Sequence, residues 1–249
     1  MRIAISGAQN TGKSTLVRSF LHTWTNYSKP KSTYREKLKA DNIQHSSKTT
    51  PSTQKMILDS MVDQMLQTKV DDNIIYDRCP LDVLAYTIWS SEKGKDGFDD
   101  GFITDQINIV RESMRFIDIV FLCKYNRKLD PVEDGQRDTN KTHIVEIDNI
   151  FESIFQQYTQ NLDADIFFPK DDSPCVIKLP HTQQERIDII QEYVTPEGTM
   201  YGDEDSILNP DNIADLEKLV MQQKAAQEGE EAQQELLKKF HLPVSSPNT

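Results

Sequence analysis

The chain has 249 residues, and its 40 Asp and Glu outnumber its 28 Lys and Arg, which gives a formal net charge of −12. This length suits one large domain, or one domain with an appendage, and is ample for a buried core. At 37% hydrophobic and 27% charged residues, the composition is that of a soluble protein. No apolar run approaches the roughly 18 residues that span a bilayer, so no membrane association is expected. The acidity disfavours general binding to nucleic acid or to a membrane surface.

The N-terminus and the cysteines indicate a cytoplasmic protein. The first ten residues, MRIAISGAQN, contain one basic residue and then a turn, without the apolar stretch of a signal peptide. Cys79, Cys123 and Cys175 form no CxxC pair and no even disulfide framework. The five histidines show no metal-ligand spacing. The sequence indicates no particular oligomeric state.

Short apolar segments alternate with helical patterns along most of the chain. A strand over 3–5 opens into a glycine-containing turn, and a helix from 13 to about 24 follows. Further strands are expected over 73–76, 117–123 and 175–179, with helices over 54–69, 80–89, 104–116, 147–162 and 182–194. Continuous apolar strands that alternate with helices are typical of a parallel sheet with helices on both faces. The predicted fold class is therefore α/β.

The last fifth of the chain has a different composition. From residue 203 onward there are ten acidic residues and four lysines, a net charge of −6, and a helix is expected over about 211–240. We therefore expect a folded domain over 1–195 and an acidic helical tail over 196–249. This tail is either a solvated helix, docked through its first half, or a helix that binds a partner.

The first strand runs directly into a complete GxxxxGK[ST] motif. Glycines in such a loop allow backbone N–H groups to point inward at a phosphate, and the helix that begins near Lys13 adds its positive dipole end. Lys13 can bridge the β- and γ-phosphates, and the Ser14 hydroxyl can ligate Mg²⁺. The motif predicts a P-loop NTPase fold that binds ATP with Mg²⁺. Its nucleotide-binding residues are Gly7, Ala8, Gln9, Asn10, Thr11, Gly12, Lys13, Ser14 and Thr15.

The strand over 73–76 ends in Asp77-Arg78. Asp77 supplies the acid that P-loop chemistry requires at the end of a strand that neighbours the loop. Asp77 can hold the metal through water or accept the proton of an attacking hydroxyl. Arg78 can grip the acceptor or a phosphate in a bidentate manner. The strand over 117–123 ends instead in Cys123 and Lys124, which argues against a motor-type or AAA+ ATPase with an acidic pair at that point.

From these residues the chain resembles the nucleoside and nucleotide kinase group of P-loop proteins, in which a strand ends in an acid–Arg pair. It looks most similar to the kinase-like domain of bacterial ribosylnicotinamide kinases and related phage ATP-binding proteins, over roughly residues 1–195. Tyr34-Arg35-Glu36 matches an Arg-containing segment beside the acceptor, and Asp134-Gly135-Gln136-Arg137 matches an acidic-Gly-x-Arg lid. The resemblance implies ATP-dependent transfer to a nucleoside or nucleotide, in the host cytoplasm if the protein is viral. It departs in the insert over 91–101, in a poorly marked second strand and in the tail.

The lid follows also from charge placement. Arg127, Lys128, Arg137 and Lys141 cluster in a stretch that precedes a helix. Phosphoryl transfer requires cations that close over the spread negative charge, and Arg137 is the expected transition-state cation.

A basic strip over 29–39 stands out in this acidic protein. It holds five cations within eleven residues: Lys29, Lys31, Arg35, Lys37 and Lys39. Three interpretations of the strip are open. It is a solvated loop, or a site for a phosphorylated small acceptor, in which Arg35 and Arg78 bind the substrate, or a surface that holds a DNA backbone. The last reading would use Tyr27 and Tyr34 for base stacking. Phage kinases that phosphorylate 5-hydroxymethyluracil in DNA also resemble this P-loop group, and that resemblance implies the alternative function, a kinase of 5-hydroxymethyluracil within phage DNA.

A second alternative is a nucleotide-dependent regulatory ATPase with the acidic tail as a partner site. GTP specificity would usually bring an NKxD-type motif, and the segment over 126–130 resembles this motif only with an extra residue. ATP is therefore the expected nucleotide.

Overall fold

The computed structural model describes residues 1–30, 49–131, 139–160 and 164–200. Residues Met1–Thr199 form one compact unit, which extends a few residues beyond the boundary expected at 195. The predicted tail helix, the basic strip from Lys31 to Lys39, and the lid residues from 132 to 138 lie outside the described residues. Within the described part of the chain, no helix is long and apolar enough to cross a membrane.

The described residues form a parallel sheet of four strands in the order β2-β1-β3-β4. The strands are β1 (Arg2–Ser6), β2 (Ile74–Asp77), β3 (Ile119–Cys123) and β4 (Cys175–Leu179). All three pairings are parallel, and Ile5 is aligned both with Asp77 of β2 and with Phe121 of β3. The expected α/β fold is therefore confirmed. Because β1 is central, the segment that follows it lies between the ends of β2 and β3.

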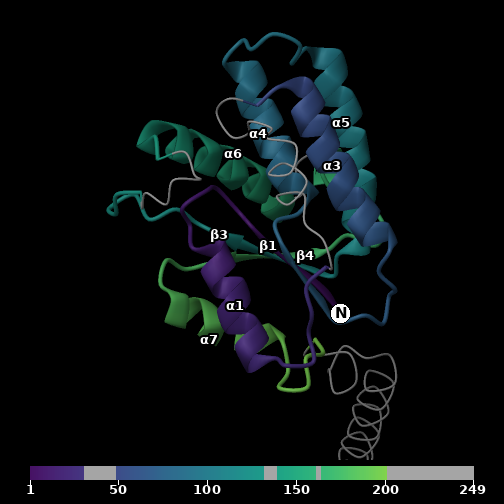
Figure 1. The fold of residues 1–249 in the computed structure, drawn as a ribbon, viewed down its shortest axis with the longest axis vertical. Coiled ribbons are helices and arrows are strands. Elements are labelled where there is room, and N and C mark those ends of the chain that lie inside the picture. Colours follow the sequence, from purple (N-terminus) through teal and green to yellow (C-terminus); the bar gives the residue numbers. More distant parts are fainter. Residues whose placement is uncertain (31–48, 132–138, 161–163, 201–249) are drawn as a thin grey trace, which may run out of the picture. The chain divides into compact units, whose positions relative to one another are not determined.

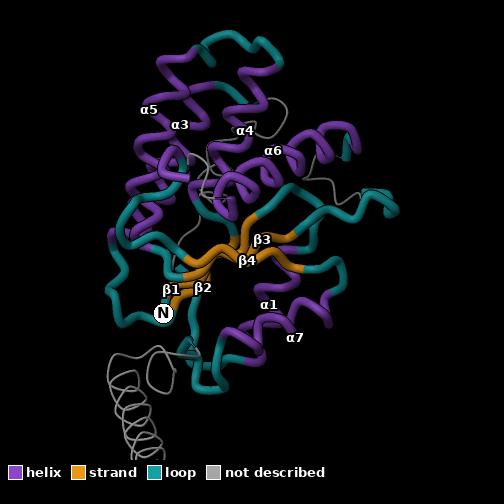
Figure 2. The backbone as a smooth tube through the Cα atoms, turned by 180° about the vertical axis from the view of Figure 1, so that it is seen from behind, coloured by secondary structure: helices purple, strands orange, loops and turns teal. Residues whose placement is uncertain are grey.

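Helices cover both faces of the sheet (Figure 1). On one side lie α3 (Pro51–Leu66), α4 (Pro80–Glu92), α5 (Asp100–Ser113) and α6 (Lys141–Gln160). On the other side lie α1 (Lys13–Thr23) and α7 (Gln183–Tyr193), which Figure 2 shows side by side beneath the strands. Two short 3₁₀ turns, Met114–Phe116 and Ala164–Ile166, complete the described elements.

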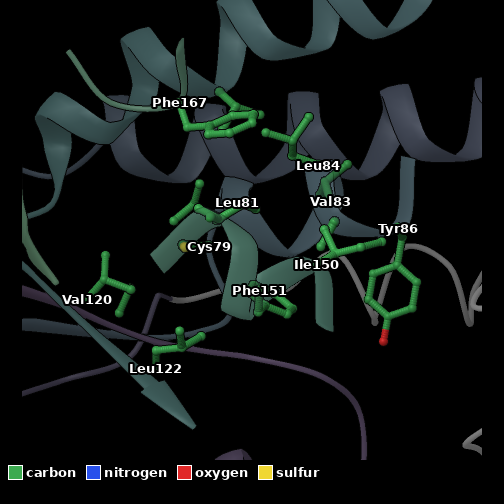
Figure 3. Close-up of a cluster of buried hydrophobic side chains, with 14 of the residues drawn as sticks. Cys79, Leu81, Val83, Leu84, Tyr86, Val120, Leu122, Ile150, Phe151 and Phe167 are labelled. Carbon is green, nitrogen blue, oxygen red and sulfur yellow. The ribbon is translucent and has the colours of Figure 1, made fainter. Parts of the chain in front are cut away.

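The main hydrophobic core lies between the sheet and the larger helical layer (Figure 3). Aliphatic side chains of α4, such as Leu81 and Leu84, pack with Val120 of β3 and Phe151 of α6. β1 and β3 are buried along their whole length, and β2 and β4 are buried at their central residues, as expected for strands whose sequences are largely continuous apolar runs. Tyr86 lies at the edge of this core, and in Figure 3 its hydroxyl points away from the aliphatic side chains.

Three helices begin earlier than their apolar periodicity predicts, because a polar cap starts each of them. The Thr50 side chain accepts a hydrogen bond from Thr53 N at 3.2 Å, with proline at the first helical position of α3. Asp99 Oδ1 accepts from Phe102 N at 2.8 Å before α5, and Asn140 Oδ1 accepts from Thr142 N at 3.0 Å before α6. The expected helices over 54–69, 104–116 and 147–162 are thus corrected to start at 51, 100 and 141. The 91–101 insert is the end of α4, a turn and the start of α5.

The end of α1 is closed by the segment that follows α7. Trp24 Nε1 donates to the Thr195 carbonyl at 2.8 Å, and the Tyr27 hydroxyl donates to the Gly198 carbonyl at 2.6 Å. Tyr27 is buried and packs edge-on against Phe20, with ring centroids 4.9 Å apart. Its proposed role in stacking on a DNA base is therefore wrong, since its face is covered and its hydroxyl is used. Just after it, Ser28 makes one isolated parallel bridge with Ile74 at the outer side of β2.

Candidate active site

The predicted site residues that the structure describes lie at the carboxyl edge of the two neighbouring strands β1 and β2. The phosphate loop follows β1 at Gly7, and Asp77 is the last residue of β2. Because Ile5 and Asp77 are aligned in the parallel pair, the loop and the acid leave the sheet at the same level. The Arg78 amide continues this pairing by donating to the Ile5 carbonyl at 3.0 Å.

The backbone of the phosphate loop requires its two glycines. Gly7 has φ of 131° and Gly12 has φ of 82°, values that side-chain-bearing residues rarely adopt. A Cβ on Gly7 would collide with the backbone carbonyl of Cys123 at the end of β3. Asn10 adds a third left-handed residue with φ of 59°, and Thr11 Oγ1 donates to the Ala8 carbonyl at 2.9 Å. The loop is thus a tight turn wedged against β3.

The loop ends at the N-terminus of α1, which provides an anion site. Gly12 is the N-cap and contributes no side-chain cap, and no acidic residue lies in the first turn. The first amides of a helix have no partner within the helix, so they and the helix dipole favour a bound anion. The chain therefore presents backbone donors where the motif predicts phosphates.

Lys13 is buried inside the loop, with only 4% of its surface exposed. Its Nζ donates to the Gly7 carbonyl at 2.6 Å, to the Ala8 carbonyl and to Thr11 Oγ1 at 3.2 Å. Burial and, to a smaller extent, the positive charge of Arg78 lower the pKa of Lys13 to about 7. A negatively charged ligand next to the Lys13 ammonium, such as a phosphate group, would therefore strongly favour the protonated form of this side chain.

Ser14 and Asp77 form the junction between the phosphate loop and β2. Ser14 Oγ donates to Asp77 Oδ2 at 2.7 Å. A hydroxyl and one carboxylate are hard oxygen ligands, and Mg²⁺ is usually bound by one or two such groups together with phosphate oxygens and water. The described part of the chain contains no cluster of three or more His, Cys, Asp and Glu that could hold a metal ion. A Mg²⁺ site made with phosphate oxygens and water does not need such a cluster. The residues present therefore fit Mg²⁺.

Arg78 is oriented by Asp82, a residue to which the sequence analysis assigned no role. Arg78 Nη1 lies 2.7 Å from Asp82 Oδ1 and 3.5 Å from the Gly7 carbonyl. Asp82 is buried, and its other oxygen accepts from Ser6 Oγ at 2.6 Å and from Cys79 N at 3.1 Å. Arg78 itself has φ of 89°, a strained conformation for a non-glycine residue, of the kind found at functional sites. This network directs the guanidinium toward the phosphate loop.

A second contact joins the loop to α4. The Tyr86 hydroxyl donates to Gln9 Oε1, and Arg78 Cζ lies 5.9 Å from the centre of the Tyr86 ring. Gln9 is 4% exposed, and its Nε2 has no hydrogen-bond partner among the described residues. Gln9 is therefore a loop residue whose side chain faces α4, whereas the motif assigned it to the nucleotide together with its neighbours.

Two residues of α7 also reach the loop, and sequence reasoning missed both. Gln183 Nε2 donates to the Gly12 carbonyl at 3.1 Å, and Arg186 Nη1 donates to the Thr11 carbonyl at 2.5 Å. Arg186 is fully buried, although a charged residue in an amphipathic helix pattern normally indicates a solvent-facing position. No local signal identifies these residues, because their partners are more than 170 positions away.

The other predicted binding residues are only partly within the described chain. Arg35 and Arg137 lie outside it, with the segments expected to form the acceptor strip and the lid. Of the remaining lid cations, Arg127 Nη2 donates to Asn149 Oδ1 at 2.5 Å. Lys141 lies 3.0 Å from Asp130 and is the first residue of α6, whereas a loop was expected there.

Comparison with known proteins places the chain in a family and a fold. A family model named AAA_28 and described as an AAA domain matches residues 2–162, so the chain belongs to this family. A search among curated proteins found no match. The fold is that of P-loop nucleoside and nucleotide kinases, as the solved structures similar to it show.

One similar structure is deoxyadenosine kinase from M. mycoides with products dCMP and a flexible dCDP bound. Its TM-score is 0.54 at 19% identity, with 77% of this chain and 97% of that chain covered. NadR protein in complex with NR has a TM-score of 0.54 at 16% identity, and the match covers 77% of this chain and 51% of that one. Thymidylate kinase from Candida albicans has a TM-score of 0.50 at 17% identity, with 77% and 89% covered.

The end of the 117–123 strand argued against a motor-type or AAA+ ATPase with an acidic pair at that point, whereas the matching family model is described as an AAA domain. In the structure, β3 does end at Cys123, and Lys124 follows it, so no acidic pair lies at this strand end. Membership of the family therefore does not depend on an acidic pair there.

Proposed function

We propose that this protein is an ATP-dependent kinase that transfers the γ-phosphoryl group to a nucleoside or a nucleotide. The observation that carries the proposal is the hydrogen bond between Ser14 and Asp77, which joins the phosphate loop to the acid of the neighbouring strand. A phosphate loop alone binds nucleotides, whereas an acid at this distance adds a group that can serve the acceptor. The acceptors named for the similar kinases support the substrate class.

The donor is bound by Gly7–Thr15. Backbone amides of this loop and the N-terminus of α1 hold the phosphates, and Lys13 contributes its charge to the β- and γ-phosphates. Ser14 and Asp77 hold Mg²⁺, which when bound neutralises charge on the phosphate oxygens.

A nucleoside acceptor attacks the γ-phosphorus through its hydroxyl, whose proton passes to Asp77, and a nucleotide acceptor attacks through an ionised phosphate oxygen. In both cases the bond to the bridging oxygen of ADP breaks. Arg78, oriented by Asp82, and Arg137 of the lid balance the negative charge that spreads over the transferred group. Two observations support this role of Arg78: its strained backbone, and its proximity to Lys13, whose pKa its charge depresses.

The acceptor lies on the α4 side of the phosphate loop. Tyr86 and Gln9 form a wall next to Arg78 there, and Gln9 Nε2 is a buried donor to which a polar acceptor group can bind. Arg35 is proposed as a further substrate-binding residue. DNA is the weaker acceptor, since Tyr27 is buried and cannot stack on a base.

The test is a screen for acceptors with γ-labelled ATP, run on free nucleosides, free nucleotides, plain DNA and DNA that contains 5-hydroxymethyluracil. Label in a free nucleoside or nucleotide is the expected result. Label in DNA alone would replace the proposal by the DNA kinase, and ATP hydrolysis indifferent to every acceptor would replace it by a regulatory ATPase.

A further inference from the structure

The phosphate loop is held from behind by α7, the last helix of the compact unit. We propose that Arg186 and Gln183 are positioning residues, which turn two successive backbone amides of the loop toward the triphosphate. The inference rests on the proposed function only in that the loop binds a triphosphate; it does not depend on the acceptor.

The two contacts fall on consecutive peptide units. Arg186 Nη1 donates to the Thr11 carbonyl at 2.5 Å, and Gln183 Nε2 donates to the Gly12 carbonyl at 3.1 Å. In a trans peptide the C=O and N–H bonds point in opposite directions within one plane. No peptide bond in the described chain is cis. Fixing the Thr11 carbonyl toward Arg186 therefore fixes the Gly12 amide toward the opposite side, where the anion binds. The Gly12 carbonyl also accepts from Leu16 N of α1 at 3.0 Å, so Gln183 reinforces a direction of the Lys13 amide that α1 already sets.

The Arg186 guanidinium is itself rigidly placed. It is buried, its Nε donates to the Pro180 carbonyl at 2.8 Å, and its Nη2 lies 3.5 Å from the Lys124 carbonyl. The Arg186 side chain thus contacts the phosphate loop, the residue that follows β3 and the residue that follows β4. Arginine has five donors in a fixed planar fork, whereas a lysine ammonium in the same place cannot reach three separate carbonyls in these directions.

Gly12 is fitted to this arrangement. A Cβ on Gly12 would lie 2.5 Å from Gln183 Nε2 and 3.3 Å from Arg186 Nη1. The loop and α7 therefore approach so closely that the second glycine of the motif serves the contact with α7 as well as the backbone conformation.

The experiment measures the binding of inorganic tripolyphosphate and of ATP to the full chain by calorimetry, without an acceptor. Tripolyphosphate has no base or sugar, so it reports on the loop alone. The variants are Arg186→Lys and Gln183→Ala. The matched control is Gln184→Ala, whose exposed side chain bonds only Asp188 of its own helix among the described contacts.

We expect Arg186→Lys to weaken tripolyphosphate and ATP by the same factor, roughly tenfold, and Gln183→Ala by roughly threefold. Gln184→Ala is expected to bind both as the wild type does. In steady-state assays the KM for ATP rises while the KM for the acceptor is unchanged, a division that a general loss of stability does not produce.

Unchanged tripolyphosphate binding in a folded Arg186→Lys protein would overturn the inference, as would a loss seen with ATP but not with tripolyphosphate. If Arg186→Lys does not fold, Gln183→Ala decides in the same way. Should no acceptor be phosphorylated while the variants still lose tripolyphosphate affinity, the proposed function fails and the positioning role stands. A wild-type protein that binds no tripolyphosphate would overturn both.

Discussion

The Ser14 hydroxyl lies 2.7 Å from Asp77 Oδ2, although the two residues are 63 positions apart in the chain. The parallel pairing of β1 and β2 brings them together, because it sets the loop after one strand beside the last residue of the other. The group that binds the donor is thereby linked to the group proposed to serve the acceptor.

Replacing Asp77→Asn is expected to reduce phosphoryl transfer by about 10²–10⁴-fold, since the amide cannot accept the proton of the acceptor. ATP binding without Mg²⁺, measured by calorimetry, should change little because the phosphate loop is intact. Asp59→Asn on the exposed side of α3 is the matched control and should keep full turnover. Near-wild-type transfer in Asp77→Asn would remove Asp77 from its catalytic role.

The buried ammonium of Lys13 predicts a pH dependence of phosphate binding. Its pKa is lowered to about 7, and a bound phosphate favours the protonated form, so the pKa rises on binding. At pH 8, binding therefore takes up a proton, and affinity falls as pH rises above about 7. Calorimetry in buffers of different ionisation enthalpy measures this uptake. It should disappear in Lys13→Ala, and equal heats in all buffers for the wild type would contradict the prediction.

The same lowered pKa acts on stability in the opposite direction. Between the folded pKa of about 7 and the ordinary lysine value, the unfolded chain binds more protons at this residue than the folded chain. The contribution of Lys13 to stability therefore rises with pH across this range and is lost as pH falls through about 7. Urea unfolding of the wild type and Lys13→Met at pH 6.5 and 8.5 measures it. Because the buried charge costs stability at pH 6.5, we expect Lys13→Met to have a higher free energy of unfolding than the wild type at that pH. This difference should shrink at pH 8.5, and a difference that is the same at both pH values would contradict the prediction.

Gly12→Ala is expected to destabilise the protein by more than the roughly 1 kcal/mol that a positive φ costs alanine. Gly94 is the matched control, because its φ is 65° and nothing lies within 4 Å of a Cβ placed there, whereas a Cβ on Gly12 meets Gln183. Urea unfolding of both alanine variants separates the backbone cost from the contact with α7. An equal loss in the free energy of unfolding for the two variants would show that the Gln183 side chain moves away from the new Cβ without an energetic cost.

Removing the Asp82 carboxylate is expected to cost about 3 kcal/mol, because the half-buried Arg78 guanidinium loses its ion pair with a buried carboxylate 2.7 Å away. Ser6 Oγ and Cys79 N lose an acceptor as well. Thermal or urea unfolding of Asp82→Ala measures the loss, with Asp63→Ala at an exposed position of α3 as the control. A loss below 1 kcal/mol would mean that Arg78 finds another acceptor.

Much of the fold could be predicted from local pattern. The strand over Cys175–Leu179 has the bounds that its apolar run predicts, and α7 lies within one residue of its expected limits at both ends. The helices that start with polar turns were placed too late, because their caps at Thr50, Asp99 and Asn140 precede the apolar periodicity.

The site divides in the same way. The loop from Gly7 and the acid at Asp77 could be found, because each follows directly from a strand and a motif. Asp82, Gln183 and Arg186 could not, since nothing in the neighbouring sequence distinguishes a buried polar residue such as Asp82 or Arg186, or a half-buried one such as Gln183, from one in water. Their roles depend on the packing of α4 and α7 against the loop.

The support that α7 gives to the loop has a consequence during synthesis. The motif leaves the ribosome among the first residues, yet the side chains that hold its carbonyls are at positions 183 and 186. A nascent chain that ends within β3 carries the whole motif without the geometry that binds phosphate tightly. If α7 has the proposed positioning role, the loop reaches its full affinity for phosphate late, when nearly the whole compact unit has been translated, and a chain interrupted earlier binds nucleotide more weakly.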